Sequence, residues 1–420
     1  MLSYACSALL AFTVLSCVCF PSFAAFLGWV KGSLATATGY NLYMGGVKSY
    51  WELSIPVCAI VGTLAALVIY SKRFWAGVLP LVLFSPFVFT AVKYAWVRQT
   101  ARPLMYGLCF CFCFALWKAP WLRRRYAMLV VTFWIMSIAI AAPYLLSGFG
   151  GGMFVFGVNP MGIVRTVCLG GEISHARAET ARRVQECDIP PVWRERIGSD
   201  TVLFAPFEMG PAMADNTQFK VVPLPSMQLY SACHPYLDDL NAALVNGPCP
   251  PDWMICNINV DWSGHFVGYP RFWNAVFRTY EFSAATDKFV LMKRRRSPAV
   301  ESQVTVVNER IVRQNEWIDC PPGVAFSVEW KRSLLGRFCS AFMRMTPCYV
   351  TFRFADGREY RCQMIADNAV CPYSLDRIPV DNSDWIKVLK GERISPVVAV
   401  RFDAETSSLY GDEIHVLQHR

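Results

Sequence analysis

Long uncharged apolar runs, separated by short basic loops, dominate the first 150 residues of the chain. A helix needs about 20 apolar residues to cross roughly 30 Å of hydrocarbon. Four runs reach or approach that length, so the pattern predicts a four-helix transmembrane region over residues 52–149. The runs are Leu53–Tyr70, Phe74–Val92, Leu104–Trp117 and Tyr126–Phe149, of which the second and third lengthen if Lys93 and Lys118 extend toward the headgroups.

A fifth apolar run, Ala5–Val30, precedes these four. Small residues at Ser22–Ala25 resemble a signal-peptidase site, but no basic segment precedes the run, and the run is longer than a usual signal core. Residues 1–30 are therefore predicted to form a retained signal anchor, with a cleaved signal peptide as the alternative. Residues 31–51 are predicted to form a loop.

Beyond residue 280 the pattern changes to short segments rich in β-branched and aromatic residues. Ala355–Arg358 centres on Asp-Gly, which predicts a hairpin between two alternating strands. Short strands without long helices predict an antiparallel sandwich or barrel over residues 281–420. The predicted strands are Lys288–Met292, Gln303–Val307, Val324–Trp330, Tyr349–Phe354, Glu359–Ile365, Val397–Phe402 and a final edge strand, Ile414–Leu417.

Residues 150–280 are rich in proline and aromatic residues, which predicts a juxtamembrane, loop-rich mixed region. This region is expected to be ordered, because disordered segments are poor in aromatics. Within it, Ala176–Val184 is predicted to form a short amphipathic helix. The predicted fold class is therefore a multispan α-helical membrane domain followed by a β-rich, antiparallel sandwich-like domain.

Charge is distributed unevenly between the two halves. Residues 1–164 contain eleven Lys/Arg and one acidic residue, Glu52, whereas the other 256 residues contain 29 basic and 30 acidic residues. The formal net charge of +9 therefore belongs to loops next to predicted spans, where lipid headgroups meet it, and direct nucleic-acid binding is not expected. The basic loops are nearly balanced between the two sides, so the orientation of the C-terminal domain stays open.

Ten cysteines lie beyond residue 164, and they would form disulfides in a lumenal domain or remain thiols in the cytosol. The chain has no Asn-x-Ser/Thr sequon, which favours the cytoplasmic side. Cys109, Cys111 and Cys113 alternate with Phe and point in different directions on a helix, so they cannot form a metal cage. They are predicted to be apolar packing residues or sites of S-palmitoylation.

The sequence contains no metalloprotease, nucleophile-elbow, P-loop, dinucleotide or Cys-x-x-Cys motif. Cys233 and His234, with Asp238 and Asp239, could be drawn as a nucleophile site, but adjacent Cys and His side chains rarely face each other. Trp262–His265 is more typical of a turn. We therefore expect no enzyme activity, no cofactor and no metal.

A basic run follows one predicted strand and is either a solvated strand end or a contact for acidic lipid, RNA or a nucleocapsid partner. The run consists of Lys293, Arg294, Arg295 and Arg296.

Three spans have aromatic and basic flanks at regular spacing: Trp51–Tyr70, Phe74–Val97 and Pro103–Trp121. Phe154–Pro160 reads Phe-Val-Phe-Gly-Val-Asn-Pro, and Cys187–Pro190 reads Cys-Asp-Ile-Pro. Over about residues 50–210 the chain thus resembles the nidovirus (coronavirus-type) membrane, or M, protein family. That family has three helices, an aromatic stretch with Phe-Asn-Pro, a Cys-Asp-Ile stretch and a β-sandwich. The chain departs from the family in its Gly-Val insertion, its fourth span and its length beyond residue 210.

The resemblance implies a non-enzymatic, integral multi-pass scaffold that oligomerises in host internal membranes and the virion envelope. Such a scaffold would bind the lipid bilayer and recruit the nucleocapsid and envelope glycoproteins. Residues Asn159, Pro160, Cys187 and Asp188 would then be assembly contacts. The alternatives are a channel-like protein of the related 3a type and a multispan anchor for a disulfide-rich lumenal domain.

Overall fold

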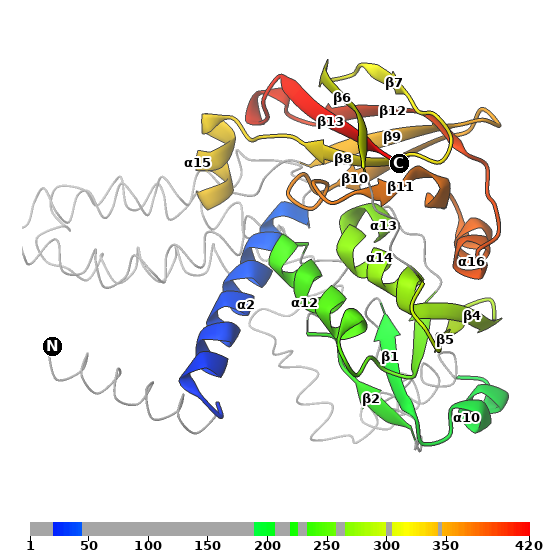
Figure 1. The fold of residues 1–420 in the computed structure, drawn as a ribbon. Helices are drawn as coiled ribbons and strands as arrows, with labels where there is room; N and C mark the ends of the chain where they lie inside the picture. Colours follow the sequence, from blue (N-terminus) through cyan, green and yellow to red (C-terminus); the bar gives the residue numbers. More distant parts are fainter. Residues whose placement is uncertain are drawn as a thin grey trace, which may run out of the picture. The chain divides into compact units, whose positions relative to one another are not determined.

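The computed structural model describes residues 20–43, 189–205, 219–225, 233–257, 265–299, 305–342 and 347–420. All of these except Phe338–Phe342 belong to one compact unit of the chain. The unit contains a mixed five-stranded sheet and two four-stranded antiparallel sheets (Figure 1).

The predicted multispan membrane domain is wrong as a description of this fold. Among the described residues, no helix is both long enough and apolar enough to cross a bilayer. The predictions of transmembrane helices and of an integral multi-pass location are corrected by the same finding. The four runs within residues 52–149, from which the prediction came, lie outside the described residues.

Helix α2 (Phe23–Tyr43) has 21 residues, and it continues through the boundary predicted between an anchor and a loop at residue 30. It interrupts its apolar residues with Gly, Lys, Ser and Thr. The helix packs against α12 (Pro235–Asn246), where buried Ala35 meets Leu237 and the Lys31 ammonium lies 3.9 Å from the centroid of the Tyr236 ring.

A mixed five-stranded sheet occupies much of the region predicted to be rich in loops. Its strand order is β2-β1-β3-β5-β4, with β2, β1 and β3 parallel and β5 antiparallel to both of its neighbours. Three of its strands are almost continuously apolar and buried, which is typical of strands covered on both faces. The strands are β1 (Thr201–Ala205), β2 (Lys220–Val222), β3 (Trp253–Asn257), β4 (Tyr280–Ala285) and β5 (Phe289–Arg294).

Three prolines of the region predicted to be rich in loops instead begin helices. Pro191, Pro235 and Pro270 lie in the first turns of α10 (Pro191–Ile197), α12 and α14 (Pro270–Thr279). Proline is favourable there because the first turn of a helix leaves its N–H groups unpaired and needs the φ angle that proline already has. The short helix α13 (His265–Gly268) directly precedes α14, which lies beside α12 (Figure 1).

The C-terminal part forms two antiparallel sheets, with strand orders β10-β9-β12-β7 and β11-β8-β13-β6. The predicted hairpin at Asp356-Gly357 is confirmed: β9 pairs with β10 around it, and Gly357 has the positive φ of 86° that the turn requires. The strands are β6 (Val306–Arg313), β7 (Trp317–Asp319), β8 (Ala325–Glu329), β9 (Cys348–Phe354), β10 (Glu359–Met364), β11 (Tyr373–Ser374), β12 (Val397–Ala404) and β13 (Glu413–His419).

The predicted final strand at Ile414–Leu417 is confirmed as part of β13, but its prediction as an edge strand is wrong, because β13 lies between β8 and β6 and pairs with both. Its inward residues Ile414 and Val416 are fully buried. One edge of this sheet is β6, which the sequence placed several residues too early, and the other is the short β11. Helix α15 (Leu334–Phe342) and two short 3₁₀ turns, Leu375–Arg377 and Ser407–Leu409, complete the described elements of this part.

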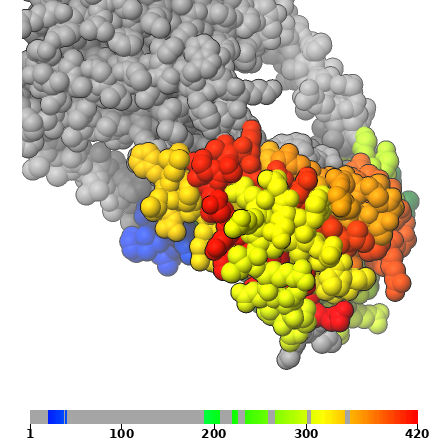
Figure 2. Space-filling model, turned by 90° about the horizontal axis from the view of Figure 1, so that it is seen from above, coloured from blue at the N-terminus to red at the C-terminus, as the bar shows by residue number. Residues whose placement is uncertain are grey.

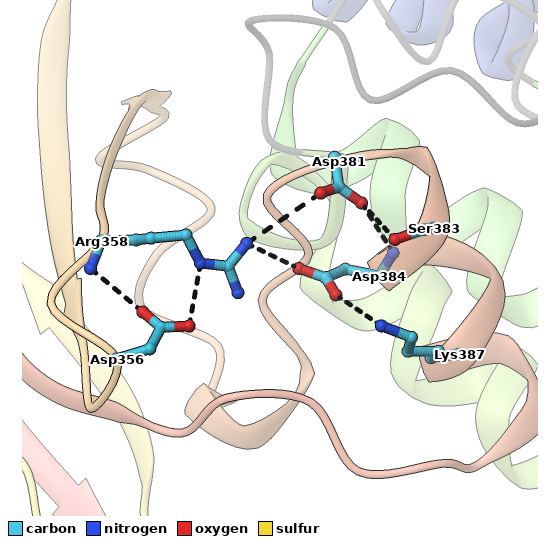
Figure 3. A network of polar contacts seen from close by, with 6 residues as sticks. All are labelled: Asp356, Arg358, Asp381, Ser383, Asp384 and Lys387. Atoms are coloured by element: carbon cyan, nitrogen blue, oxygen red, sulfur yellow. Dashed lines mark hydrogen bonds and ion pairs between the residues drawn. The ribbon is translucent and has the colours of Figure 1, made fainter.

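A polar network fixes helix α16 (Asn382–Lys390) against the β9–β10 turn (Figure 3). The Asp381 carboxylate caps the helix by accepting the Asp384 N–H at 2.9 Å. The Arg358 guanidinium donates to Asp356 at 2.9 Å and lies 3.5 Å from the buried Asp384 carboxylate. Lys387 contacts the other oxygen of Asp384 at 3.4 Å, so this buried charge is paired from two sides.

An aromatic cluster joins α16 to α13 and α14. The rings of Phe266 and Trp385 stack with centroids 4.3 Å apart, and Trp273 meets both edge-on at 5.0 and 5.3 Å. Both tryptophans are fully buried. The Asn368 amide also donates to the Gly268 carbonyl at 2.6 Å. These contacts pack α13 and α14, which follow β3, against α16 and Asn368 of the C-terminal part.

Candidate functional site

Several residues singled out from the sequence lie outside the described residues. They are the proposed assembly contacts Asn159, Pro160, Cys187 and Asp188, and the proposed palmitoylation sites Cys109, Cys111 and Cys113.

The basic run is described, and it lies where β5 ends. The Arg294 guanidinium binds the Asp252 carboxylate at 2.7 Å and the Pro250 carbonyl at 2.6 Å. Arg295 donates to the Tyr280 carbonyl at 2.9 Å. Lys293 lies over the Trp253 ring, 5.2 Å from its centroid, and Arg296 is exposed. The run therefore closes one end of the sheet instead of presenting four unengaged charges.

The Asp252 carboxylate, which pairs with Arg294, also accepts hydrogen bonds from Thr201. Burial alone would raise its pKa, but hydrogen bonds from the Thr201 hydroxyl and N–H, together with the Arg294 charge, lower that pKa below its usual value. The hydroxyl bond is short, at 2.6 Å. The ion pair consequently joins the start of β1 to the end of β5.

The four residues considered as a nucleophile site serve local structure. The Asp238 carboxylate is fully buried and accepts the N–H groups of Arg271 and Phe272 at 3.1 and 2.8 Å, so α12 caps the start of α14. Burial raises the pKa of Asp238 to about 7, although these two bonds and the Arg271 charge oppose the rise. Asp239 pairs with the Arg271 guanidinium at 3.0 Å.

Cys233 and His234 also have structural contacts. The Cys233 thiol lies 2.8 Å from the Tyr269 hydroxyl in a buried position. The Nδ1 atom of His234 accepts the Tyr236 N–H at 3.1 Å and caps α12, which requires that this nitrogen carry no proton. Burial lowers the pKa of His234; the charge of Asp367 acts against this shift, and the charges of Arg332 and Lys31 act with it. These contacts support helix capping and packing.

The part of the chain that the structure describes gives little support for a catalytic cysteine or a metal site. No group of three or more His, Cys, Asp or Glu residues there could hold a metal ion. Burial raises the pKa of the Cys371 thiol to about 11 and of Cys320, Cys348 and Cys362 to about 12, so these thiols are poor nucleophiles. The described cysteines are thiols: Cys233, Cys249, Cys256, Cys320, Cys339, Cys348, Cys362 and Cys371.

Strand β6 offers a different kind of site, because it is a long edge. Most other edge strands are short: β11 has two residues, and β2 and β7 have three each. Helix α16 lies beside the edge strand β4, and α13 lies near the edge strand β10. Strand β6 has eight residues and, within the described ranges, pairs only with β13.

The surface of β6 combines apolar and charged side chains. Val306, Val307 and Ile311 are 55%, 54% and 59% exposed, whereas Val312 points into the core. Because successive residues of a strand alternate between faces, Glu309, Ile311 and Arg313 share the outer face. Val307 lies at an irregularity of the strand, where Gln418 pairs with Asn308 and His419 with Val306. Figure 2 shows the yellow and yellow-green segment that contains β6 uncovered in that view. We take this edge as the candidate functional site.

Sequence reasoning missed β6 as a site. It predicted a strand at Gln303–Val307, but the alternation that could have extended it, Val307-Glu309-Ile311-Arg313, does not distinguish an edge from a central strand. The edge is determined by the pairing of β13, about a hundred residues later.

No known protein family, curated protein or solved structure matches this chain.

Proposed function

We propose that this chain is an assembly protein whose antiparallel sheets bind another polypeptide as an added strand along β6. The observation that carries the proposal is the length of this edge together with its exposed apolar side chains. A strand edge presents a row of backbone donors and acceptors that pair readily with an extended chain. Natural proteins usually shorten or cover such edges, as the other sheets here do.

The outer face of β6 supports selective pairing. Ile311 and Val307 supply apolar contacts, and Glu309 and Arg313 supply charges of opposite sign two residues to either side of Ile311. Cross-strand apolar and opposite-charge pairs each stabilise a sheet by roughly 0.2–1 kcal/mol. A scaffold role is thus the part of the function expected from the resemblance that this geometry supports.

Site-specific photocrosslinking in cells that express the full chain tests the proposal. A photoreactive benzoylphenylalanine at Val307 should form covalent adducts with a polypeptide, and Ile311→Lys should abolish them. The matched control places the same residue at Val398, which is 38% exposed but belongs to β12, a strand paired on both sides. Adducts of equal yield at both positions, or adducts that survive Ile311→Lys, would refute the proposal.

A further inference from the structure

We infer that the strand added to β6 is β6 of a second copy of this chain, antiparallel, with Ile311 opposite the partner's Ile311. This inference rests on the proposed function and names its partner. It follows from the symmetry of strand pairing and from the order of charges along β6.

Symmetry limits the possible registers. Two identical antiparallel edge strands are related by a two-fold axis perpendicular to the sheet. Such an axis keeps each face of the sheet on its own side, and directly opposed residues in an antiparallel pair lie on one face. The axis must therefore pass between a residue and the same residue of the partner, so only registers centred on a single residue are allowed.

Charge selects among these registers. Centring on Arg310 opposes this residue to the partner's Arg310, and centring on Glu309 opposes it to the partner's Glu309. Like charges directly opposite each other destabilise a sheet. Centring on Ile311 instead opposes Ile311 to the partner's Ile311, and each Glu309 to the partner's Arg313. This register forms two opposite-charge pairs around one apolar pair.

The remaining registers are poorer. Centring on Asn308 opposes the apolar Val307 to the partner's Glu309. Centring on Val312 leaves only three residues of each β6 paired, because the strand ends at Arg313. Among the described residues, no salt bridge joins Glu309 or Arg313 to another side chain, so both charges are available for pairing across the axis.

Charge reversal tests the register. Glu309→Arg alone and Arg313→Glu alone each place two like-charge pairs across the axis. Each should weaken dimerisation of the purified full chain by about tenfold or more in sedimentation velocity. The double variant restores opposite charges and should return the dimer dissociation constant to within about threefold of the original. Arg310→Glu is the matched control, because Arg310 faces the partner's Val312 in this register.

Cysteine crosslinking gives an independent readout. Opposed residues in an antiparallel pair have Cα atoms about 4.5–5.5 Å apart, which a disulfide can bridge. Mild oxidation of Ile311→Cys should therefore give a crosslinked dimer, identified by mass spectrometry of the peptide joined through residue 311. Val307→Cys, an exposed site on the same strand that does not oppose its own copy in this register, should give no such self-crosslink.

The outcomes separate this inference from the proposed function. A chain that stays monomeric at all concentrations, or a double variant as weak as the single ones, overturns the second copy as partner. If the Val307 photocrosslink still captures another polypeptide in that case, the assembly function stands and only the partner is wrong. If that crosslink is also absent, both fail.

Discussion

The mixed sheet and the edge strand β6 of the antiparallel sheets differ in how they use their charged residues. In the mixed sheet and its helices, the conspicuous cations lie against carboxylates and carbonyls of the same region, as Arg294 does with Asp252 and Arg271 with the buried Asp238. In the antiparallel sheets, Glu309, Arg310 and Arg313 lie exposed along an edge. A dense basic run in the sequence is therefore no sign of four free charges, because Arg294 and Arg295 are used within the fold.

The edge strands of the two regions differ in whether another element covers them. Strand β4 of the mixed sheet has α16 beside it, with the Lys390 ammonium 5.4 Å from the centroid of the Phe282 ring. Strand β6 has no such cover among the described residues. The following predictions test the internal contacts of the mixed sheet and its helices, or the availability of β6.

The largest effect is expected from Trp385→Ala. Removing this fully buried ring breaks the stack with Phe266 and should lower the free energy of unfolding by roughly 3–5 kcal/mol. Urea denaturation measures the loss, and hydrogen exchange should show faster exchange in β4 as α16 loosens. Leu334→Ala, at a residue 84% exposed, is the control and should change little. A loss below about 1 kcal/mol for Trp385→Ala would mean that the cluster does not hold α16 in place.

Asp238→Asn should change how stability depends on pH. Because the folded pKa of about 7 lies above the ordinary aspartate pKa of 3.8, the folded state holds this proton more tightly than the unfolded state. The resulting stabilisation is complete below about pH 4 and is lost as pH rises to about 7. Asp238→Asn should remove this slope from denaturation curves measured between pH 4 and 8. The neighbouring Asp239→Asn should leave the slope in place, and equal slopes in wild type and Asp238→Asn would contradict the assignment.

Two arginines of the basic run should differ in their effect on stability. Arg294→Met removes a charged hydrogen bond and an ion pair at a partly exposed site, and should cost about 1–2 kcal/mol. Arg296→Met, at an exposed position, should stay within about 0.5 kcal/mol. Thermal denaturation of both variants compares their losses of stability. Equal losses would show that Arg294 contributes no more to stability than the exposed Arg296 does.

The smallest effect on folding is expected from Val307→Lys. This side chain points away from the core, so the free energy of unfolding of the monomer should change by less than about 0.5 kcal/mol. Assembly through β6 should nevertheless be lost, since a lysine on an edge discourages strand addition. Chemical denaturation at low protein concentration measures the first quantity and sedimentation at high concentration the second. A folding defect as large as the assembly defect would place Val307 in the core.

The sequence predicted the antiparallel strands best, because each buries one face and alternates accordingly. The Asp356-Gly357 turn and the strands on either side of it lie where the pattern placed them. Strands β1, β3 and β5 were missed or shifted because burial on both faces removes the alternation. Pro235 and Pro270 suggested loops, but the first turn of a helix accepts proline equally well. The multispan class was inferred from apolar length alone and is corrected by the described helices.

The candidate site was beyond sequence reasoning for a different reason. Whether Val306–Arg313 is an edge depends on how many strands pair with it. Its described neighbour, β13, comes from residues 413–419, far along the chain. No local pattern in β6 contains that information.

The insertion of β13 between β6 and β8 also has a consequence for biosynthesis. These two strands lack their common neighbour until a segment some hundred residues downstream of β6 has left the ribosome. Strands that are far apart in the sequence pair slowly, and a strand that is still unpaired is prone to misassembly. During that interval both sides of β6 are open to pairing, so nascent chains on one message could join through the wrong side. Correct assembly then depends on β13 reaching its place before a neighbouring chain does.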